Sequence, residues 1–219
     1  MLILVEGQTE ERFVKTILGP WLLSAGVIVA PTILVTKRAS DGKRFKGGVS
    51  SYAKFRTDVQ RLIGSRGGAY VTTLLDYYGL PSDFPGMLTR PQGSTVQRVE
   101  FVEHAIAADF GNPADFRPFL ALHEFEAWLF ASETALPDTL EPEVDKDKFA
   151  AICQSFSTPE DINERPTLAP SKRIVSLAPG YRKALHGPVI AERIGLQTIR
   201  DKCPHAAKWF ADLESFAGR

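Results

Sequence analysis

The sequence has few cysteines and no long apolar segment, and both features limit the class of protein. Cys153 and Cys203 are the two cysteines among 219 residues, and they show no CxxC spacing. They form neither a disulfide framework nor a zinc motif, so we expect reduced thiols. No apolar run approaches the roughly 18 residues that a membrane span needs. The N-terminus has no basic leader before a long apolar core, which predicts a strand there and not a signal peptide. We therefore expect a cytoplasmic protein.

Net charge is also absent, because 26 basic side chains balance 26 acidic ones. Overall charge therefore gives no argument for binding to nucleic acid or to a membrane. The charges are unevenly distributed, however. Residues 37–66 carry nine lysines and arginines against two acids, whereas residues 133–164 carry nine acids. A composition of 44% hydrophobic and 24% charged residues is ordinary for a folded globular protein.

The apolar pattern predicts an α/β fold. MLILVE at the start and AYVTTLLD at residues 69–76 are short apolar runs, typical of strands covered on both faces. VIVAPTILVT predicts a further strand, and FRPFLALHEFEAWLF predicts a strand that passes directly into a helix. Apolar residues at helical spacing lie between these runs, around residues 13–22, 51–64 and 95–110. This alternation predicts a parallel sheet of about four strands flanked by helices.

The strand signal disappears beyond residue 132. Residues 145–217 contain several short helical patterns separated by proline and glycine, and they end in the amphipathic HAAKWFADLESF. We therefore expect an α/β core at residues 1–132 and a helical extension at residues 133–219, packed on the core. The two cysteines both lie in this extension.

Three of the predicted strands deliver an acid to the same edge of the sheet. Glu6 ends the first, Asp76 ends the third, and Glu124 follows the fourth. Ligands of open parallel sheets bind outside the carboxyl ends of the strands. Carboxylates gathered there repel one another unless a cation neutralises them, and oxygen ligands suit Mg²⁺ or Mn²⁺.

A second explanation is that each acid only begins a helix, where a carboxylate favours the helix dipole. This explanation suits Glu10, Glu11 and Glu126 better than it suits Glu6 or Asp76, which precede their helices or lie in loops. The adjacent Gly7 serves either a close approach to a ligand or only the strand-to-helix turn. The chain contains no P-loop pattern and no GxGxxG after a strand.

VEGQTEERF together with LLDYYGLP resembles the Toprim arrangement of topoisomerases, primases and overcoming-lysogenization-defect nucleases. In that fold, a glutamate after the first strand and a DxD pair after a later strand hold divalent metal for phosphodiester chemistry. Nearly the whole chain also resembles the bacterial domain-of-unknown-function 4276 family. The stretches that carry this second resemblance are VEGQTEERFV, DYYGLP, HEFEAWLF, PSKRI and Cys203–Pro204 with Trp209. The resemblances imply a Toprim-like fold.

The Toprim resemblance implies that Glu6 is the metal-binding glutamate and Asp76 the first acid of DxD. Tyr78 occupies the position of the second acid. Either Asp83 or Glu124 supplies the missing oxygen, or the site binds metal weakly, or the chain is a degenerate Toprim used for binding. Glu124 is the preferred substitute because it lies at another strand end. The expected ligands of Mg²⁺ or Mn²⁺ are thus Glu6, Asp76 and Glu124, with Asp83 as the alternative.

The aromatic and imidazole side chains near these acids have two interpretations each. LHEFEAW is not a zinc-protease motif, because Ala127 stands where HExxH needs its second histidine. His123 either packs and forms hydrogen bonds, or acts as a general acid near a leaving group. Tyr77 and Tyr78 either stack on bases or attack a phosphate, or they pack in the core and cap the crevice.

Two basic clusters are candidates for phosphate contacts. The first lies in a glycine-containing loop with aromatic residues nearby, and it comprises Lys37, Arg38, Lys43, Arg44 and Lys46. Its alternative is a solvated surface. The second cluster comprises Ser171, Lys172 and Arg173 at a helix start, followed by Tyr181, Arg182, Lys183 and His186. These groups either bind an anion or pair with the acidic block.

These patterns support two main hypotheses. The first is an Mg²⁺- or Mn²⁺-dependent nuclease, or a related phosphodiester-processing enzyme, acting on nucleic acid, with DNA ranked before RNA. His123 or Lys172 would assist proton transfer there. The second is a binding or regulatory module without turnover. For it the resemblance implies a partner ATPase of the AAA or ABC type and a setting in phage defence. A small-molecule hydrolase or transferase ranks last, because no nucleophile elbow or cofactor fingerprint occurs.

Overall fold

A computed structural model gives the fold of the chain, and it describes residues 1–34, 37–38, 44–45, 49–65, 69–142, 144–162 and 166–217. Its centre is a parallel sheet with the strand order β2-β1-β5-β6, in which β7 also pairs with β5. The strands are β1 Leu2–Val5, β2 Ala30–Ile33, β5 Val71–Asp76, β6 Phe116–Arg117 and β7 Leu120–Ala121. The predicted α/β fold with a parallel sheet of about four strands is therefore confirmed.

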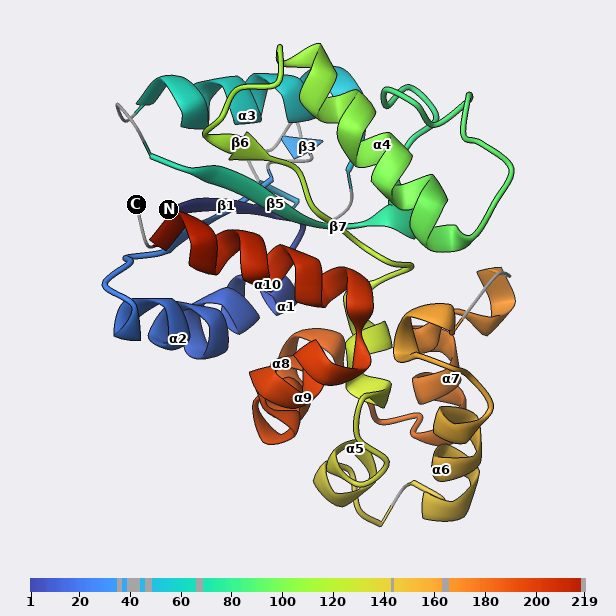
Figure 1. The fold of residues 1–219 in the computed structure, drawn as a ribbon. Helices are drawn as coiled ribbons and strands as arrows, with labels where there is room; N and C mark the ends of the chain where they lie inside the picture. Colours follow the sequence, from blue (N-terminus) through green and yellow to red (C-terminus); the bar gives the residue numbers. More distant parts are fainter. Residues whose placement is uncertain are drawn as a thin grey trace.

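Helices cover both faces of this sheet (Figure 1). α3 and α4 lie on one face, and α1, α2 and α10 lie on the other. The α-helices are α1 Gln8–Phe13, α2 Gly19–Ser24, α3 Tyr52–Ser65, α4 Thr95–Asp109, α5 Ala135–Thr139, α6 Lys146–Gln154, α7 Pro170–Leu177, α8 Lys183–Ile194, α9 Leu196–Lys202 and α10 Pro204–Ala217. A π-helix, η1 Val14–Leu18, joins α1 to α2, and the 3-10 helices are η2 Tyr77–Gly79, η3 Phe125–Phe130, η4 Pro159–Asp161 and η5 Pro166–Leu168.

The sequence of β1 is apolar throughout because both of its faces are buried. Side chains of successive residues point to opposite faces of a strand. Ile3 and Val5 join the hydrophobic cluster on the side of α1 and α10, whereas Leu2 and Leu4 join the cluster under α3 and α4. Because helices cover both faces, neither set can be polar.

The fourth predicted strand differs from the expectation. It is broken into β6 and β7, which both pair with β5. Pro118 lies in the break, and proline has no backbone N–H to donate to a neighbouring strand. Residues 122–124 then separate β7 from the following helix, which begins at Phe125 and is the 3-10 helix η3. The predicted passage of a strand directly into a helix is therefore wrong.

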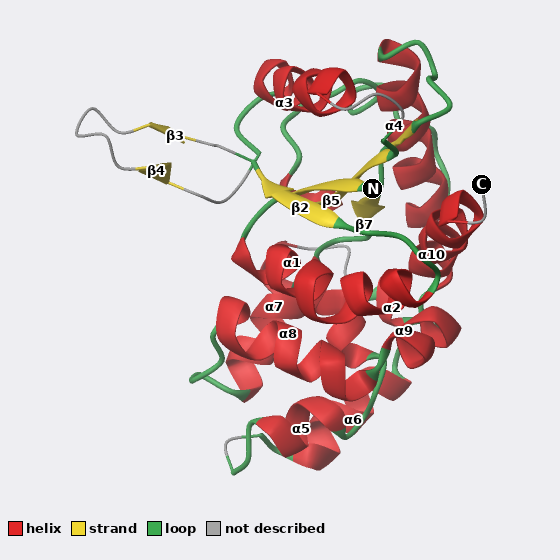
Figure 2. Cartoon of the chain, turned by 90° about the vertical axis from the view of Figure 1, so that its left-hand side faces the viewer, coloured by secondary structure: helices red, strands yellow, loops and turns green. Residues whose placement is uncertain are grey.

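The basic segment after β2 also differs from the expected loop. Lys37–Arg38 forms β3 and Arg44–Phe45 forms β4, and the two strands pair antiparallel. In Figure 2 they lie beyond the edge strand β2, away from the sheet and its helices. The structure gives the backbone of these four residues; Lys43 and Lys46 lie outside the described residues.

The C-terminal helices contribute to the same core as the sheet. Trp209 on α10 donates from Nε1 to Oγ1 of Thr72 on β5 at 3.0 Å, and its ring stacks on Phe119 with centroids 4.4 Å apart. One buried cluster contains residues from Ile3 to Leu213. The division at residues 132 and 133 stays a prediction. In the described part of the chain, no helix has the length and apolar character needed to cross a membrane.

Candidate functional site

Two predicted site residues meet where neighbouring strands end. β1 and β5 are adjacent and parallel, with Val5 opposite Leu74. Glu6 follows β1 and Asp76 ends β5, so both acids reach the carboxyl end of the sheet. The backbone N–H of Asp76 donates a hydrogen bond to Oε2 of Glu6 at 3.1 Å. This bond joins the Glu6 carboxylate to the backbone of Asp76, so the two residues lie side by side at the edge of the sheet.

Two further acids belong to this group, although the sequence pattern favoured a helix-start role for them. Glu10 is buried on α1, and its Oε2 accepts a hydrogen bond from the N–H of Gly7 at 2.8 Å. Glu126 on η3 is 1% exposed, and its Oε1 accepts from the hydroxyl of Tyr181 at 3.3 Å. A signal for Glu10 exists in the sequence: it shares one helix face with the apolar Phe13, where an exposed acid is not expected.

Lys183 of α8 links two acids that follow the fourth predicted strand. Its Nζ lies 2.9 Å from Oε2 of Glu124 and 3.0 Å from Oε2 of Glu126. The other oxygen of Glu124, Oε1, accepts the backbone N–H of Ser171 at 2.6 Å, at the start of α7. Lys183 belongs to the second basic cluster of the sequence, and it pairs here with site acids outside the acidic block of residues 133–164.

The carboxyl groups strongly influence one another. Burial, followed by the charges of Glu6, Glu10 and Glu126, holds the pKa of Asp76 well above its usual range, although the residue keeps a small exposed surface. Burial and the same kind of repulsion raise the pKa of Glu10 to about 7. Burial also raises the pKa of Glu126. For Lys183, burial lowers the pKa but Glu126, Glu124 and Asp76 together outweigh it, so its pKa is raised. Full ionisation of these acids would therefore put more negative charge into the site than Lys183 offsets.

The donor atoms fit a hard divalent cation at Glu6 and Asp76. Carboxylate oxygens are the ligands that Mg²⁺ and Mn²⁺ prefer, and a cation would offset both the burial and the mutual repulsion that raise these pKa values. Among the residues that the structure describes, no group of three or more Asp, Glu, His and Cys side chains is arranged to hold a metal ion. Both oxygens of Glu124 already accept hydrogen bonds, from Lys183 and from Ser171, so a cation at Glu124 would face the ammonium group of Lys183.

Three further residues of the predicted site, Asp83, Tyr78 and His123, lie in different surroundings. Oδ2 of Asp83 accepts the backbone N–H of Tyr52 at 2.9 Å, at the beginning of α3. Tyr78 is 50% exposed, and its N–H donates to the carbonyl of His123 at 3.0 Å. His123 is buried and has φ of 65°. Asp83 thus lies with α3, whereas Tyr78 and His123 lie beside the acid group.

The second basic cluster is only partly directed toward solvent. Lys172 on α7 is exposed. Arg173 donates from Nε to the carbonyl of Leu168 at 2.9 Å, and its guanidinium lies over the ring of Phe156, 5.3 Å from the centroid. Arg173 therefore stabilises the C-terminal helices, and Lys172 is the member of this pair that faces solvent.

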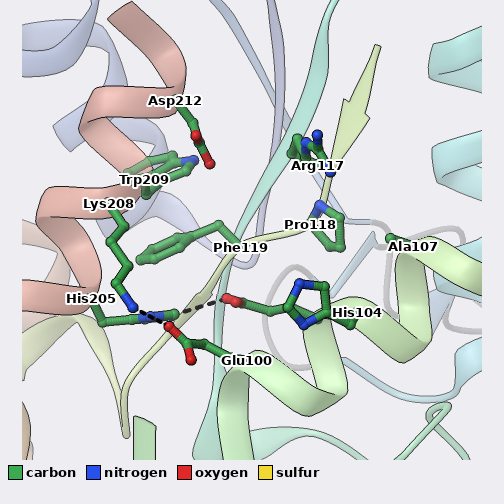
Figure 3. Close-up of a pocket in the computed structure, with 11 residues that line it drawn as sticks. Glu100, His104, Ala107, Arg117, Pro118, Phe119, His205, Lys208, Trp209 and Asp212 are labelled. Atoms are coloured by element: carbon green, nitrogen blue, oxygen red, sulfur yellow. Dashed lines mark hydrogen bonds and ion pairs between the residues drawn. The ribbon is translucent and has the colours of Figure 1, made fainter. Parts of the chain in front are cut away.

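A separate cavity of about 230 Å³ lies between α4, β6 and α10 (Figure 3). In it, Nε2 of the buried His205 lies 3.0 Å from Oε1 of Glu103. The ring of Phe119 stacks against those of His205 and Trp209, at centroid distances of 5.0 and 4.4 Å. Burial lowers the pKa of His205, but the hydrogen bond and charge of Glu103 outweigh it, so its pKa is raised. The sequence pattern did not predict this pair, because His205 and Glu103 lie on different helices.

A parallel sheet with carboxylates gathered at its carboxyl end places the chain among the α/β proteins that carry an acidic site at that edge. The model of one family, described as "Domain of unknown function (DUF4276)", matches residues 5–214. The chain belongs to this family. No curated protein and no solved structure matches it.

Proposed function

We propose that this protein is a Toprim-like, Mg²⁺- or Mn²⁺-dependent enzyme that hydrolyses phosphodiester bonds of nucleic acid. The contact between Glu6 and Asp76 at adjacent strand ends carries the proposal. The Toprim resemblance assigns metal binding to these same two positions. Burial, followed by repulsion among Glu6, Glu10, Asp76 and Glu126, raises the pKa values of Asp76 and Glu10, which supports a cation as the partner of these acids.

Glu6 and Asp76 are the residues that would hold the metal. A divalent cation supplies polarisation of a phosphoryl oxygen and a more acidic water at such a site. Burial and its acidic neighbours raise the pKa of Glu10 to about 7, and a bound cation would lower it, so Glu10 would act as a proton acceptor beside the metal. His123 stays the predicted general acid, and it lies one residue before Glu124. Asp83 stays the alternative ligand, although its carboxylate contacts the start of α3.

The expected partner is nucleic acid, with DNA before RNA. Lys172 is exposed next to Ser171, whose N–H contacts Glu124, so it lies near the acid group. The basic strands β3 and β4 lie beyond the edge of the sheet (Figure 2), where they would contact the nucleic acid further from the site. A cytoplasmic location remains our expectation.

Cleavage assays test this proposal. Wild-type protein should cleave DNA or RNA in Mg²⁺ or Mn²⁺ and not in EDTA. Glu6→Gln and Asp76→Asn should lower the rate at least about 100-fold, because each removes a charged oxygen ligand at the reaction centre. Glu192→Gln, on the exposed face of α8, is the matched control and should keep the wild-type rate. Wild-type protein that is inert on both nucleic acids with either metal would overturn the proposal.

A second function is favoured by one observation, the engagement of Glu124 by Lys183. Together with Tyr78 at the second DxD position, it supports a catalytically degenerate Toprim-like binding module. The Toprim resemblance implies a partner ATPase for such a module, in the setting of phage defence. Calorimetry distinguishes the two functions. A module of this kind shows no heat of Mn²⁺ binding and co-purifies with an ATPase, whereas an enzyme shows saturable Mn²⁺ binding that Glu6→Gln abolishes.

A further inference from the structure

A second pocket adjoins the acid group and has the opposite charge. Its volume is about 340 Å³, and seven described residues line it, none of them acidic. These are Tyr77, Tyr78, Met87, Arg90, Thr95, Arg98 and His123. By contrast, three acids contribute to the lining of the cavity around His205. A lining with two guanidinium groups, an imidazole and two phenols suits an anionic ligand with an aromatic part.

Two of the residues that line the pocket are covalent neighbours of site acids. Tyr77 directly follows Asp76, and His123 directly precedes Glu124. The hydrogen bond from the N–H of Tyr78 to the carbonyl of His123, 3.0 Å long, joins these two segments. A ligand in the pocket therefore lies against the backbone that also positions two of the site acids.

Arg90 is held in the pocket by neutral oxygen atoms. Its Nη1 donates to the hydroxyl of Tyr77 at 3.0 Å and its Nε donates to the carbonyl of Met87 at 2.8 Å. Its guanidinium also lies 5.8 Å from the centroid of the Tyr77 ring. Neutral acceptors and an aromatic ring fix the orientation of a guanidinium without cancelling its charge. On α4, Nη2 of Arg98 donates to Oγ1 of Thr95 at 3.3 Å.

His123 enters the pocket from a constrained backbone. The N–H of Glu124 donates to the carbonyl of Leu122 at 3.0 Å, which closes a three-residue turn around His123. With φ of 65°, the backbone of His123 lies in the left-handed region, which residues other than glycine rarely adopt. Strained conformations of this kind persist mainly where a site needs a side chain in one direction.

We infer that the pocket formed by Arg90, Arg98, His123 and Tyr78 binds a phosphate group of a nucleic-acid strand next to the acid group. The inference rests on the proposed function and names the part of the substrate that this pocket takes. Bidentate guanidinium groups recognise phosphate oxygens, and the half-exposed ring of Tyr78 offers a surface on which a base stacks.

Binding without metal tests the inference separately from catalysis. The probe is a fluorescein-labelled single-stranded DNA of about 12 nucleotides, within the range of single-strand site sizes, followed by anisotropy in EDTA. Arg90→Gln and Arg98→Gln should each weaken binding about 10-fold and reduce the salt dependence by about one phosphate contact. Tyr78→Ala should weaken binding through lost stacking, with the salt dependence unchanged. Arg193→Gln, an exposed arginine on α8, is the control and should bind as wild type.

Two further comparisons sharpen the result. Probes with a 5′-phosphate and with a 5′-hydroxyl show whether the pocket takes a terminal or an internal phosphate, because only a terminal site discriminates between them. Arg98→Lys keeps the charge and loses the bidentate geometry. If Arg98→Gln fails to fold, weaker DNA binding by Arg98→Lys provides the same test. Wild-type affinity in the Arg90 and Arg98 variants, or no binding by the wild-type protein in EDTA, overturns the inference even where cleavage occurs. Arginine-dependent binding without any cleavage supports the pocket and rejects the proposed hydrolysis.

Discussion

The backbone N–H of Asp76 donates to Oε2 of Glu6 across 3.1 Å, and this bond links two strand ends that are 70 positions apart in the sequence. It turns the Glu6 carboxylate toward the end of β5, near enough to the Asp76 carboxyl group for its charge to help raise the pKa of Asp76, after burial. Oδ1 of Asp76 in turn accepts the N–H of Phe125 at 2.9 Å, the first residue of η3. Three segments of the chain are thus held together by carboxylates at one edge.

The first prediction concerns Glu10 and pH. The pKa of Glu10 is raised from 4.5 to about 7, so the folded state holds a proton more tightly than the unfolded chain. The stabilisation from this group is complete below pH 4.5 and is lost as the pH rises through about 7. Glu10→Gln should therefore be more stable than wild type at pH 8, by on the order of 1–3 kcal/mol. Its amide oxygen can still accept from Gly7.

Urea unfolding between pH 5 and pH 8 measures this effect. The stability difference between Glu10→Gln and wild type should shrink toward pH 5, where wild-type Glu10 is protonated. Glu11→Gln, at the neighbouring and more exposed position, serves as the control. An equal difference at both pH values would contradict the assignment.

The second prediction concerns metal and thermal stability. A cation that binds the folded state alone raises the unfolding temperature, and its free-energy effect is about 2.7 kcal/mol at 100 times its dissociation constant. Mn²⁺ should raise the unfolding temperature of the wild-type protein at pH 8. Asp76→Asn should remove most of this rise, because it takes one expected ligand away. An unchanged rise in Asp76→Asn would place the ion elsewhere.

The third prediction concerns Lys183. Its ammonium group contacts Glu124 and Glu126, whose side chains are 8% and 2% exposed. Lys183→Met should leave two buried carboxylates without this partner. The loss of stability at pH 8 should be about 2 kcal/mol, less than for a fully buried pair, because the lysine side chain is itself half exposed.

The loss in Lys183→Met should diminish as the pH falls toward 5, because burial raises the pKa of Glu126 and the group takes up a proton more readily than an ordinary glutamate. Lys148→Met, an exposed lysine paired with Asp145, is the matched control and should change stability little. Chemical denaturation at both pH values measures the two variants. Equal losses for both lysines would show that the buried pairing contributes nothing specific.

The fourth prediction concerns the pair of His205 and Glu103. The pKa of His205 is raised, so the stability that its charge contributes is complete below about pH 6.5, the unfolded value. It is lost as the pH rises through the folded pKa. Glu103→Gln keeps an acceptor for the N–H of Leu120 and removes the charge beside His205. The variant should lose stability at pH 6 and should approach wild type at pH 9.

An NMR titration of the His205 ring gives the direct measurement, because Glu103→Gln should lower its pKa. His104, which lines the same cavity, provides an internal reference in the same spectra. A His205 pKa that does not move in Glu103→Gln would show that the carboxylate is not its dominant partner.

Several features of this protein follow from short stretches of sequence. The apolar run of β1 predicts a strand covered on both faces, and Glu6 follows it at once, so its place at the strand end is fixed by the covalent chain. The same reasoning places Asp76 at the end of β5. Pro118, by contrast, lies inside a stretch whose apolar pattern predicts a single strand, and its missing N–H divides that strand into β6 and β7.

The sequence by itself determined the α/β alternation and the delivery of acids to one edge, because both depend on local apolar periodicity and on neighbours in the chain. Only the tertiary structure decided that Glu10 and Glu126 join this edge, that Lys183 engages Glu124, and that Arg90 and Arg98 form a positive pocket beside it. The physical reason is that such contacts depend on how helices pack against the sheet. That packing brings together residues far apart in the sequence, and no local pattern encodes the distance between them.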